Sequence, residues 1–382
     1  MVILSSIPKL DMFQIAEDMD SRGMLTHMYT GFASQKNRLI NAVVKRRDNE
    51  QIPSNAITDF WSLQVVHHFH RSSIYNEAFD RIVAQLLKKR DDYKAVLAWS
   101  GMAEHTLIQA KKEGKLAVVA RGSCHIEMQN MILTQEFSKY GLRYEVDDRI
   151  TKKELREYKI AEKIYVCSSF VKNSFLERGF EESKIFVNPI PVSALFSRIP
   201  STKLNDKFII LFLGKLTIQK GLRYLFEAIE QLDMAENDFE VWFVGGFEKT
   251  VLAEFYSKKK SNWKYIGFVP QRNLAQLISC ADVGVFPSVQ DGFAQVVTQQ
   301  LSCGVPVIAT SNTGASDLIV DGYNGYVVAP FSSSQIAEKI MLMYHNCKQL
   351  AEMKINAEKI KSELLSNRVI ADNFANFFKS NL

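Results

Sequence analysis

Short apolar runs alternate with longer amphipathic segments along most of this chain of 382 residues. Apolar runs such as 95–101 and 208–214 are typical of buried parallel strands, and segments such as 74–90 carry apolar residues at helical spacing. Strands that alternate with helices predict doubly wound parallel sheets covered by helices. The pattern therefore places the chain in the α/β class.

The alternation stops between residues 189 and 207, where three of the nine prolines lie. A chain of this length is too long for one ordinary core and suits two domains. We therefore predict a first domain over residues 1–190, a linker over 191–206 and a second domain over 207–364. A C-terminal helix over 365–382 is expected to pack back on the first domain.

Charge and cysteine content exclude several classes of protein. The net charge of +5, from 47 basic and 42 acidic residues, is too small for the basic stripe of a nucleic-acid binder, but it allows contact with an anionic membrane surface or acceptor. No two of the five cysteines have C-x-x-C spacing, which argues against structural zinc and for a reducing compartment. With no recognisable signal peptide or membrane-spanning run, we predict a cytoplasmic protein with at most peripheral membrane contact and no nucleic-acid partner.

A loop with two lysines follows the strand predicted near residue 208. In FLGKLTIQKG, residues 212–221, Gly214 ends the strand, and Lys215 and Lys220 precede a strongly amphipathic helix. Backbone N–H groups and two ammonium groups at a helix start predict a phosphate-binding loop. The loop is neither a Walker loop nor G-x-G-x-x-G. The alternative interpretation is two solvated lysines on a surface.

The segment PSVQDGFAQVVTQQLSCGVPVIAT, residues 287–310, combines a polar loop, a helix, a glycine stop and a buried strand. Asp291 stands before the helix, and Gly292 allows close approach of the backbone. The helix start at 293–295 offers N–H groups to an anion. Gln299 lies roughly 12 Å farther along the helix, about the span from the sugar to the ribose of a nucleotide sugar. Alternatively, Asp291 is a helix cap and Gln299 a surface residue.

Taken in order, these motifs resemble the donor domain of family 4 glycosyltransferases, which have the GT-B fold. GKLTIQKG is similar to the family's G-R-x-x-x-x-K-G, and PSVQDGFAQ with its following helix is similar to P-S-x-x-E-G-F-G and E-A-x-A-x-G-x-P-V-I-A. GASDLIVDGYNG is similar to G-G-x-x-E followed by D-G-x-x-G. The match spans about residues 206–330, and 168–196 resembles the stretch that leads into the family's linker.

The resemblance implies two facing Rossmann-like doubly wound domains with a cleft between them. It also implies a hexosyl or related transferase that moves a sugar from a UDP- or GDP-linked donor to a hydroxyl of a glycan or glycolipid acceptor. Retention of configuration, no metal, no cofactor and a place in cell-surface polysaccharide or lipid-linked glycan synthesis are expected from the same resemblance. A phosphorylase or epimerase of the same fold and a two-lobed solute-binding protein are the other classes, but no pyridoxal-phosphate site or signal peptide is recognisable.

The resemblance assigns donor-binding roles to positions in both motifs. These are Gly214, Lys215, Lys220, Asp291, Gly292, Phe293, Ala294, Gln295 and Gln299. Lys215 replaces an arginine, Ala294 a glycine, and Asp291 and Gln299 the two glutamates of E-x7-E; Asp317 likewise replaces a glutamate. The exchanges at the lysine, the aspartates and the glutamine keep a charge or a hydrogen-bonding group. The alternative is a weak or inactive relative that binds sugar nucleotides.

Polar residues also follow a predicted buried strand of the first domain, in KLAVVARGSCHIEMQ, residues 115–129. The resemblance places a histidine near the reacting sugar, and His125 is the best candidate. The predicted catalytic residues are His125, Lys220 and Asp291. Alternatively, His125 caps the following helix and Arg121 pairs with a neighbouring acid.

The strand ends of the first domain supply the predicted acceptor-binding residues. These are Gly31, Trp99, Arg121 and Ser123, of which Trp99 is equally suited to core packing. The histidines of HHFHR, residues 67–71, have no neighbouring carboxylates or defined ligand spacing. We therefore predict no metal site there.

Overall fold

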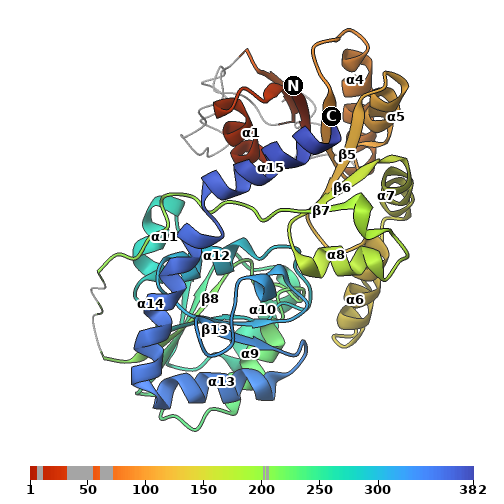
Figure 1. Cartoon of the computed structure of the whole chain (residues 1–382). Coiled ribbons are helices and arrows are strands. Elements are labelled where there is room, and N and C mark those ends of the chain that lie inside the picture. Colours follow the sequence, from red (N-terminus) through yellow and green to blue (C-terminus); the bar gives the residue numbers. More distant parts are fainter. Residues whose placement is uncertain (7–11, 32–54, 61–71, 201–202, 204–205) are drawn as a thin grey trace, which may run out of the picture.

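The computed structural model describes residues 1–6, 12–31, 55–60, 72–200, 203 and 206–382. These residues form two α/β domains, one above the other in Figure 1. Each domain is built on one sheet in which all neighbouring strands are parallel. The predicted fold class, two doubly wound Rossmann-like domains, is therefore confirmed.

The first sheet has the strand order β3-β2-β1-β4-β5-β6-β7. Its strands are β1 (Val2–Ser6), β2 (Leu25–Thr30), β3 (Ile57–Asp59), β4 (Ala95–Trp99), β5 (Leu116–Arg121), β6 (Lys163–Val166) and β7 (Ile185–Val187). Its helices are α1 (Met12–Ser21), α4 (Ser72–Leu87), α5 (Glu104–Lys112), α6 (Ile126–Ser138), α7 (Asp148–Ile160) and α8 (Ser169–Leu176), with the 3₁₀ turn η1 (Glu182–Lys184).

Side chains of the first sheet alternate between two apolar layers, because successive residues of a strand point to opposite faces. Val96 and Ala98 of β4 belong to the layer that includes residues of α4, α5 and α8. Ala95 and Leu97 belong to the layer under α1 and the C-terminal helix α15 (Asn367–Asn381). Burial on both faces explains why these strands read as continuous apolar runs.

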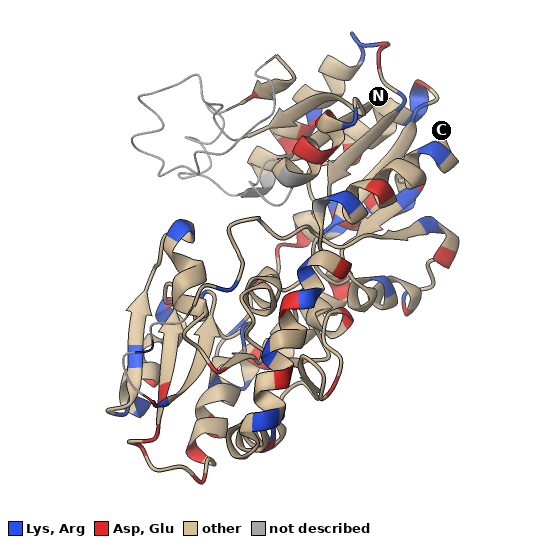
Figure 2. Ribbon diagram, turned by 60° about the vertical axis from the view of Figure 1, so that its left-hand side comes forward, with Lys and Arg blue, Asp and Glu red and all other residues tan. Residues whose placement is uncertain are grey.

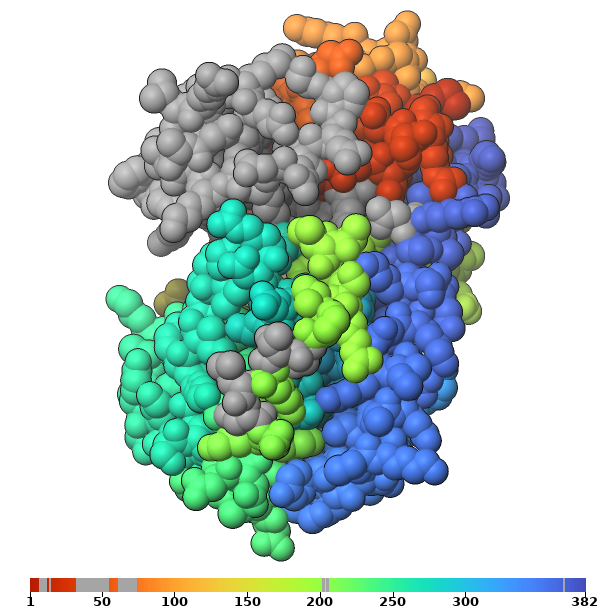
Figure 3. All heavy atoms as spheres, turned by 90° about the vertical axis from the view of Figure 1, so that its left-hand side faces the viewer, coloured from red at the N-terminus to blue at the C-terminus, as the bar shows by residue number. Residues whose placement is uncertain are grey.

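The C-terminal helix α15 lies on the first domain, although the chain reaches it from the second. Its Phe374 packs against Tyr165 of β6 with ring centroids 5.0 Å apart, and the Asn188 side chain donates to the Ile370 carbonyl at 3.0 Å. Figure 3 shows the blue C-terminal part of the chain, which ends in α15, running along one side of both domains. The two ends of the chain thus pack together on one sheet face.

The second sheet has the order β10-β9-β8-β11-β12-β13. Its strands are β8 (Phe208–Leu213), β9 (Phe239–Val244), β10 (Trp263–Gly267), β11 (Val283–Phe286), β12 (Val307–Thr310) and β13 (Gly325–Val328). Its helices are α9 (Leu222–Glu230), α10 (Lys249–Lys258), α11 (Gln271–Ile278), α12 (Gln295–Ser302), α13 (Ser333–His345) and α14 (Cys347–Glu363), with the 3₁₀ turn η2 (Gly314–Asp317).

Both sheets reverse their strand order at one point, which lies between β1 and β4 in the first sheet and between β8 and β11 in the second. In open α/β sheets, ligands bind outside the carboxyl ends of the strands at such a switch point. The residues that follow β8 and β11 are Gly214 and Pro287. Both predicted donor motifs therefore begin at the switch point of the second sheet.

Charged side chains of both signs are interspersed over the two domains (Figure 2). No helix of the described part of the chain is long and apolar enough to span a bilayer.

Candidate active site

The loop after β8 turns sharply into α9 and carries two lysines. Gly221, the N-cap of α9, has φ +67°, a left-handed conformation that favours glycine. A Cβ at this position would lie 1.9 Å from the carbonyl oxygen of Pro287. Lys220 directly precedes this turn, and Lys215 is exposed at the beginning of the loop. The close backbone contact joins the two donor motifs.

The loop after β11 is held by backbone hydrogen bonds on both sides. The Val289 N–H donates to the Gln219 carbonyl at 3.0 Å, which joins it to the lysine loop. The Asp291 N–H donates to the Asn312 carbonyl at 3.1 Å, and the Gly314 N–H donates to the Asp291 carbonyl at 3.0 Å. Asp291 is therefore fixed between the lysine loop and the start of η2.

Lys220 and Asp291 form an ion pair at the start of α12. The second carboxylate oxygen of Asp291 accepts from the Ala294 N–H at 3.2 Å, so the alternative interpretation of Asp291 as a helix cap also describes this state. Lys220 Nζ additionally lies 5.3 Å from the centroid of the Phe286 ring. The site thus combines a cation, a carboxylate and the N-terminal turn of a helix, which leaves backbone N–H groups without intrahelical partners.

The other predicted donor residues lie along the same loop and helix. Phe293 and Ala294 are buried, and Ala294 has φ +62°, the conformation for which a glycine is better suited. Gln295 is the first residue of α12, and the half-buried Gln299 follows just over one turn later. Helix α12 therefore carries only the second half of the predicted span, from Gln295 to Gln299, whereas Asp291 lies in the loop before the helix, so the span of eight residues is not helical throughout as the predicted length assumed.

The first domain touches the donor loop directly. A Cβ on Gly292 would lie 2.0 Å from the carbonyl oxygen of Gly122. The Ser123 hydroxyl donates to Gln290 Oε1 at 2.9 Å, and the Ser168 hydroxyl donates to the Gly292 carbonyl at 2.5 Å. The two domains therefore meet at the loop that carries Asp291.

Asp317 forms a second contact between the domains. Its carboxylate accepts from the Ser169 N–H at 2.6 Å, at the start of α8, and burial raises its pKa. Neither Ser168, Ser169 nor Gln290 was assigned a role from the sequence. The only local signal was the position of Ser168 and Ser169 just beyond a strand end.

The His125 side chain lies in a buried aromatic cluster. Its ring centroid is 5.0 Å from that of Phe175, 5.2 Å from that of Tyr158 and 5.8 Å from that of Phe180. Its Nδ1 accepts from the Glu127 N–H at 3.4 Å, so the residue caps α6. The structure shows the capping alternative, and a catalytic role for His125 stays a prediction that its burial does not favour.

Because the His125 ring is buried, we expect the stability of the protein to depend on pH. Burial, with Arg178 and Arg121 as smaller causes, lowers the pKa of His125 to about 4, below its value in the unfolded chain. The unfolded state binds the proton more readily than the folded state. The neutral ring's contribution to the free energy of unfolding is therefore complete above pH 6.5 and is lost as pH falls toward 4. We expect the wild-type free energy of unfolding to fall in this window by up to about 3 kcal/mol more than that of His125→Asn.

Denaturant titrations of both proteins between pH 4 and 7 measure this difference. His27, whose pKa burial also lowers to about 4, stays in both proteins, so its contribution cancels. Parallel pH profiles for wild type and His125→Asn would contradict the prediction.

Arg121 is engaged by the first domain itself. Its Nη1 lies 3.0 Å from Glu154 Oε2, its Nε donates to the Cys124 carbonyl at 3.2 Å, and its Nη2 donates to Gln129 Oε1 at 2.5 Å. The guanidinium is almost fully buried. The structure therefore shows the alternative of an arginine paired with an acid, which leaves it poorly placed to contact an acceptor.

The remaining predicted acceptor residues divide into two groups. Trp99 and Ser123 lie at the domain contact, since a Cβ on Gly122 would be 2.6 Å from the Trp99 ring and Ser123 binds Gln290. Gly31 follows β2, three strands away from β5. The structure does not bring Gly31 beside the Gly122 loop.

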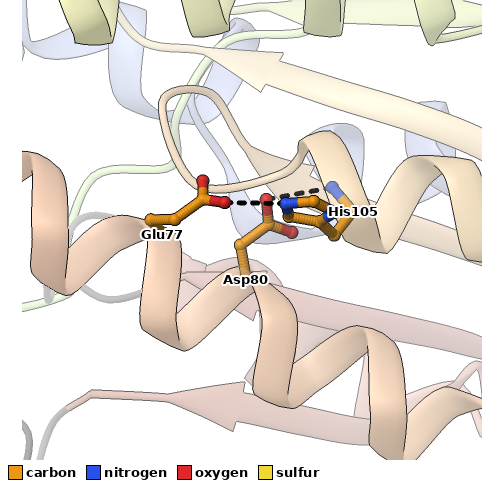
Figure 4. A group of neighbouring side chains, drawn as sticks. All are labelled: Glu77, Asp80 and His105. Atoms are coloured by element: carbon orange, nitrogen blue, oxygen red, sulfur yellow. Dashed lines mark hydrogen bonds and ion pairs between the residues drawn. The ribbon is translucent and has the colours of Figure 1, made fainter.

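A cluster of Glu77, Asp80 and His105 has side-chain spacing that fits a metal ion (Figure 4). Lys153 Nζ, however, lies 2.6 Å from Glu77 Oε2 and 2.7 Å from Asp80 Oδ2. His105 Nε2 lies 2.7 Å from Glu77 Oε1. An ammonium group already balances these carboxylates, so we assign no metal to them. The histidines of 67–71 lie outside the described residues.

Beside this cluster, a cavity of about 520 Å³ opens at the carboxyl end of β4. Helices α4 and α7 and the first turn of α5 line it with ionisable side chains and two isoleucines. Its ionisable residues are Glu77, Arg81, Glu104, His105, Arg149, Lys153 and Arg156. The cavity offers both hydrogen-bond donors and acceptors at the ligand-binding edge of the first sheet.

Comparison with known proteins gives a family match over the second domain. The family model for glycosyl transferases group 1 matches residues 196–360. The uncharacterized glycosyltransferase MJ1178 of Methanocaldococcus jannaschii is 25% identical over 186 residues, which cover 49% of this chain and 50% of that protein. The capsular polysaccharide biosynthesis glycosyltransferase CapM of Staphylococcus aureus is 27% identical over 180 residues, 43% of this chain and 46% of CapM. The chain thus spans about half the length of these curated relatives.

Solved structures resemble the whole chain. HepE of Anabaena, in complex with UDP, superposes with a TM-score of 0.73 and 17% identity over 99% of both chains. S. aureus TarM superposes with a TM-score of 0.74 and 12% identity over 99% of this chain and 98% of TarM. The chain therefore has the GT-B fold, and its residues 196–360 match the glycosyl transferases group 1.

Proposed function

We propose that the chain is a glycosyltransferase that moves a hexosyl or related group from a UDP- or GDP-linked donor to a hydroxyl of a glycan or glycolipid acceptor. The observation that carries the proposal is that Lys220 and Asp291 meet beside the start of α12, at the switch point of the second sheet. Gly292 of the same loop contacts Gly122 of the first domain. The fold shared with HepE, whose structure contains UDP, and the family match to glycosyl transferases group 1 support the proposal.

The leaving group of such a reaction is a diphosphate, whose developing charge must be stabilised. The exposed Lys215 and the half-buried Lys220 supply ammonium groups, and α12 supplies N–H groups and its dipole. In the free protein Lys220 pairs with Asp291, so an arriving diphosphate competes with that carboxylate. These residues would balance the diphosphate without a metal ion.

Retention of configuration is part of the proposal. The bond from the anomeric carbon to the phosphate oxygen breaks, and a bond to the acceptor oxygen forms on the same face of the sugar. The acceptor hydroxyl gives its proton to the departing phosphate oxygen. Asp291, released from Lys220, would then hold a hydroxyl of the transferred sugar.

The acceptor would approach from the first domain, along Trp99 and Ser123 and the cavity at the end of β4. Its mixed charges suit a polyhydroxylated ligand, which needs both donors and acceptors. A role in cell-surface polysaccharide or lipid-linked glycan synthesis, and a cytoplasmic location with peripheral membrane contact, remain predictions.

A donor panel tests the proposed function. Thermal shifts with UDP- and GDP-sugars identify the donor, because a ligand specific for the folded state raises its stability. Product analysis with glycan and glycolipid acceptors then reports transfer and the anomeric configuration of the product. Binding without transfer would favour an inactive sugar-nucleotide-binding relative, and the absence of any nucleotide-sugar binding would contradict the proposal.

The Lys220–Asp291 pair gives a prediction with opposite signs for binding and transfer. In Asp291→Asn the side chain can still accept from the Ala294 N–H, but the competing negative charge is gone. We expect the affinity for UDP or GDP alone to rise about threefold, since an opposing charge is removed from the diphosphate. We expect kcat to fall by about tenfold, since the hydrogen bond to the transferred sugar loses its charge. Calorimetric titration and steady-state kinetics measure the two effects.

Asp372→Asn is the matched control. Asp372 lies on α15, which packs on the first domain, and its half-exposed carboxylate pairs with Arg22. It should leave both constants unchanged. A fall in nucleotide affinity for Asp291→Asn would show that this carboxylate does not compete with the diphosphate.

A further inference from the structure

Helix α6 belongs to the first domain by its place after β5, but its apolar face packs into the second. Met128, Ile132 and Leu133 of α6 are buried in the cluster that contains the core of α9. The N-terminal end of the helix, in contrast, is fixed in the first domain, where the His125 N–H donates to Ser174 at 2.8 Å. The helix therefore connects the two domains on the side of the donor site.

The C-terminal turn of α6 is held to the start of α9 by a network that we call the α6–α9 clamp. Its members are Glu136, Lys139, Tyr140, Arg223, Tyr224 and Phe331. The Tyr224 hydroxyl is 2.9 Å from both oxygens of Glu136, a carboxylate with no exposed side-chain surface. Lys139 Nζ donates to Glu136 Oε2 and to the Tyr224 hydroxyl, each at 2.9 Å.

Aromatic contacts complete the clamp. The guanidinium of Arg223 lies 3.5 Å from the centroid of the Tyr140 ring, and its Nη1 donates to the Lys139 carbonyl at 3.2 Å. Phe331 places its ring 4.2 Å from Lys139 Nζ and 5.7 Å from the Tyr224 ring. A buried carboxylate with charged and hydroxyl donors is costly to separate from its partners, so the clamp favours one relative position of the two helices.

Both helices begin at the donor site. Helix α6 starts just after the loop of Gly122 and Ser123, which touches Gly292 and Gln290. Helix α9 starts directly after Gly221, two residues beyond Lys220. Resting on the proposed transfer function, we propose that the α6–α9 clamp holds the first domain closed on the donor loop. Glu136, Lys139, Arg223 and Tyr224 are then positioning residues, because they fix the reacting parts without touching the donor.

The double variant Arg223→Ala/Tyr224→Phe tests the clamp, and Arg272→Ala/Tyr256→Phe is its matched control. Arg272 and Tyr256 are exposed on α11 and α10, and neither side chain takes part in a hydrogen bond or ion pair described for the structure. We expect small-angle scattering of the clamp variant to give a larger radius of gyration, and hydrogen exchange to rise in residues 133–140 and 290–294. These two readouts need no enzymatic activity, so they remain decisive if no transfer is found.

Kinetics separate positioning from donor binding. Most predicted donor contacts lie in the second domain, so we expect the clamp variant to change the Kd for UDP less than threefold while kcat falls about tenfold. Wild-type dimensions, exchange and kcat in the clamp variant would overturn the proposal, as would equal changes in the control.

A double-mutant cycle guards against general damage to the fold. Tyr224→Phe removes the hydroxyl donor to Glu136, and Glu136→Gln removes the carboxylate that Tyr224 and Lys139 share. Each single variant should enlarge the radius of gyration and lower kcat. Because both substitutions break one network, the double variant should lose clearly less than the sum of the two single losses. Fully additive losses would contradict the clamp as we describe it.

Discussion

Replacing Lys220 by alanine is expected to lower kcat/KM for the sugar donor by a factor of about 10² to 10³. The ammonium group lies at the start of α9 and beside the start of α12, where we place the diphosphate. Removing one preorganised donor to a developing charge typically has an effect of this size. The substitution also leaves Asp291 without its cation, so the remaining carboxylate repels the diphosphate and lowers the affinity for UDP or GDP.

Steady-state kinetics with the identified donor, together with calorimetric titration of the nucleotide, measure both effects. Lys259→Ala is a suitable control, since Lys259 is an exposed lysine of the same domain. Near-normal turnover of Lys220→Ala would remove this lysine from the mechanism.

Replacing Gly221 by alanine is expected to destabilise the protein by about 3 kcal/mol. The backbone at Gly221 is left-handed, which costs an L-residue about 1–2 kcal/mol. The new Cβ would also lie 1.9 Å from the Pro287 carbonyl oxygen, so the lysine loop and the Asp291 loop must move apart. Overpacking of this kind adds about 1–3 kcal/mol.

Denaturant unfolding of Gly221→Ala measures the loss, with Gly246→Ala as the control. Gly246 lies in the loop that follows the neighbouring strand β9. Its φ is not left-handed, and a Cβ there would meet no atom within 4 Å. We expect the control to stay within about 0.5 kcal/mol of wild type. Equal stability of the two variants would show that the loops do not pack as described.

The fold was largely predictable because its signal is local and repeated. Buried parallel strands such as β4 and β8 are continuous apolar runs, and amphipathic α9 lies between two of them. The three-residue strand β3 was not predicted, since all its residues are only half-buried and its segment shows no clear periodicity. Short edge strands form when a neighbour supplies their hydrogen bonds, which local pattern does not report.

The candidate site was predictable where it depends on a strand end and a helix start. Lys220 and Asp291 stand at such positions, and the structure joins them. Contacts between the domains were not predictable, because Ser169 and Asp317 lie 148 residues apart and meet only through the relative position of two sheets. The burial of His125 depends likewise on rings supplied by α7 and α8 and by the turn after α8.

The most direct test of the central claim is a crystal structure of the chain with UDP or GDP, whichever nucleotide raises its melting temperature more. We expect the pyrophosphate to lie within hydrogen-bonding distance of Lys220 and of the first N–H groups of α12, with Lys215 nearby. Asp291 should then have turned away from Lys220. A pyrophosphate bound elsewhere, away from both the lysine loop and the start of α12, would contradict this account.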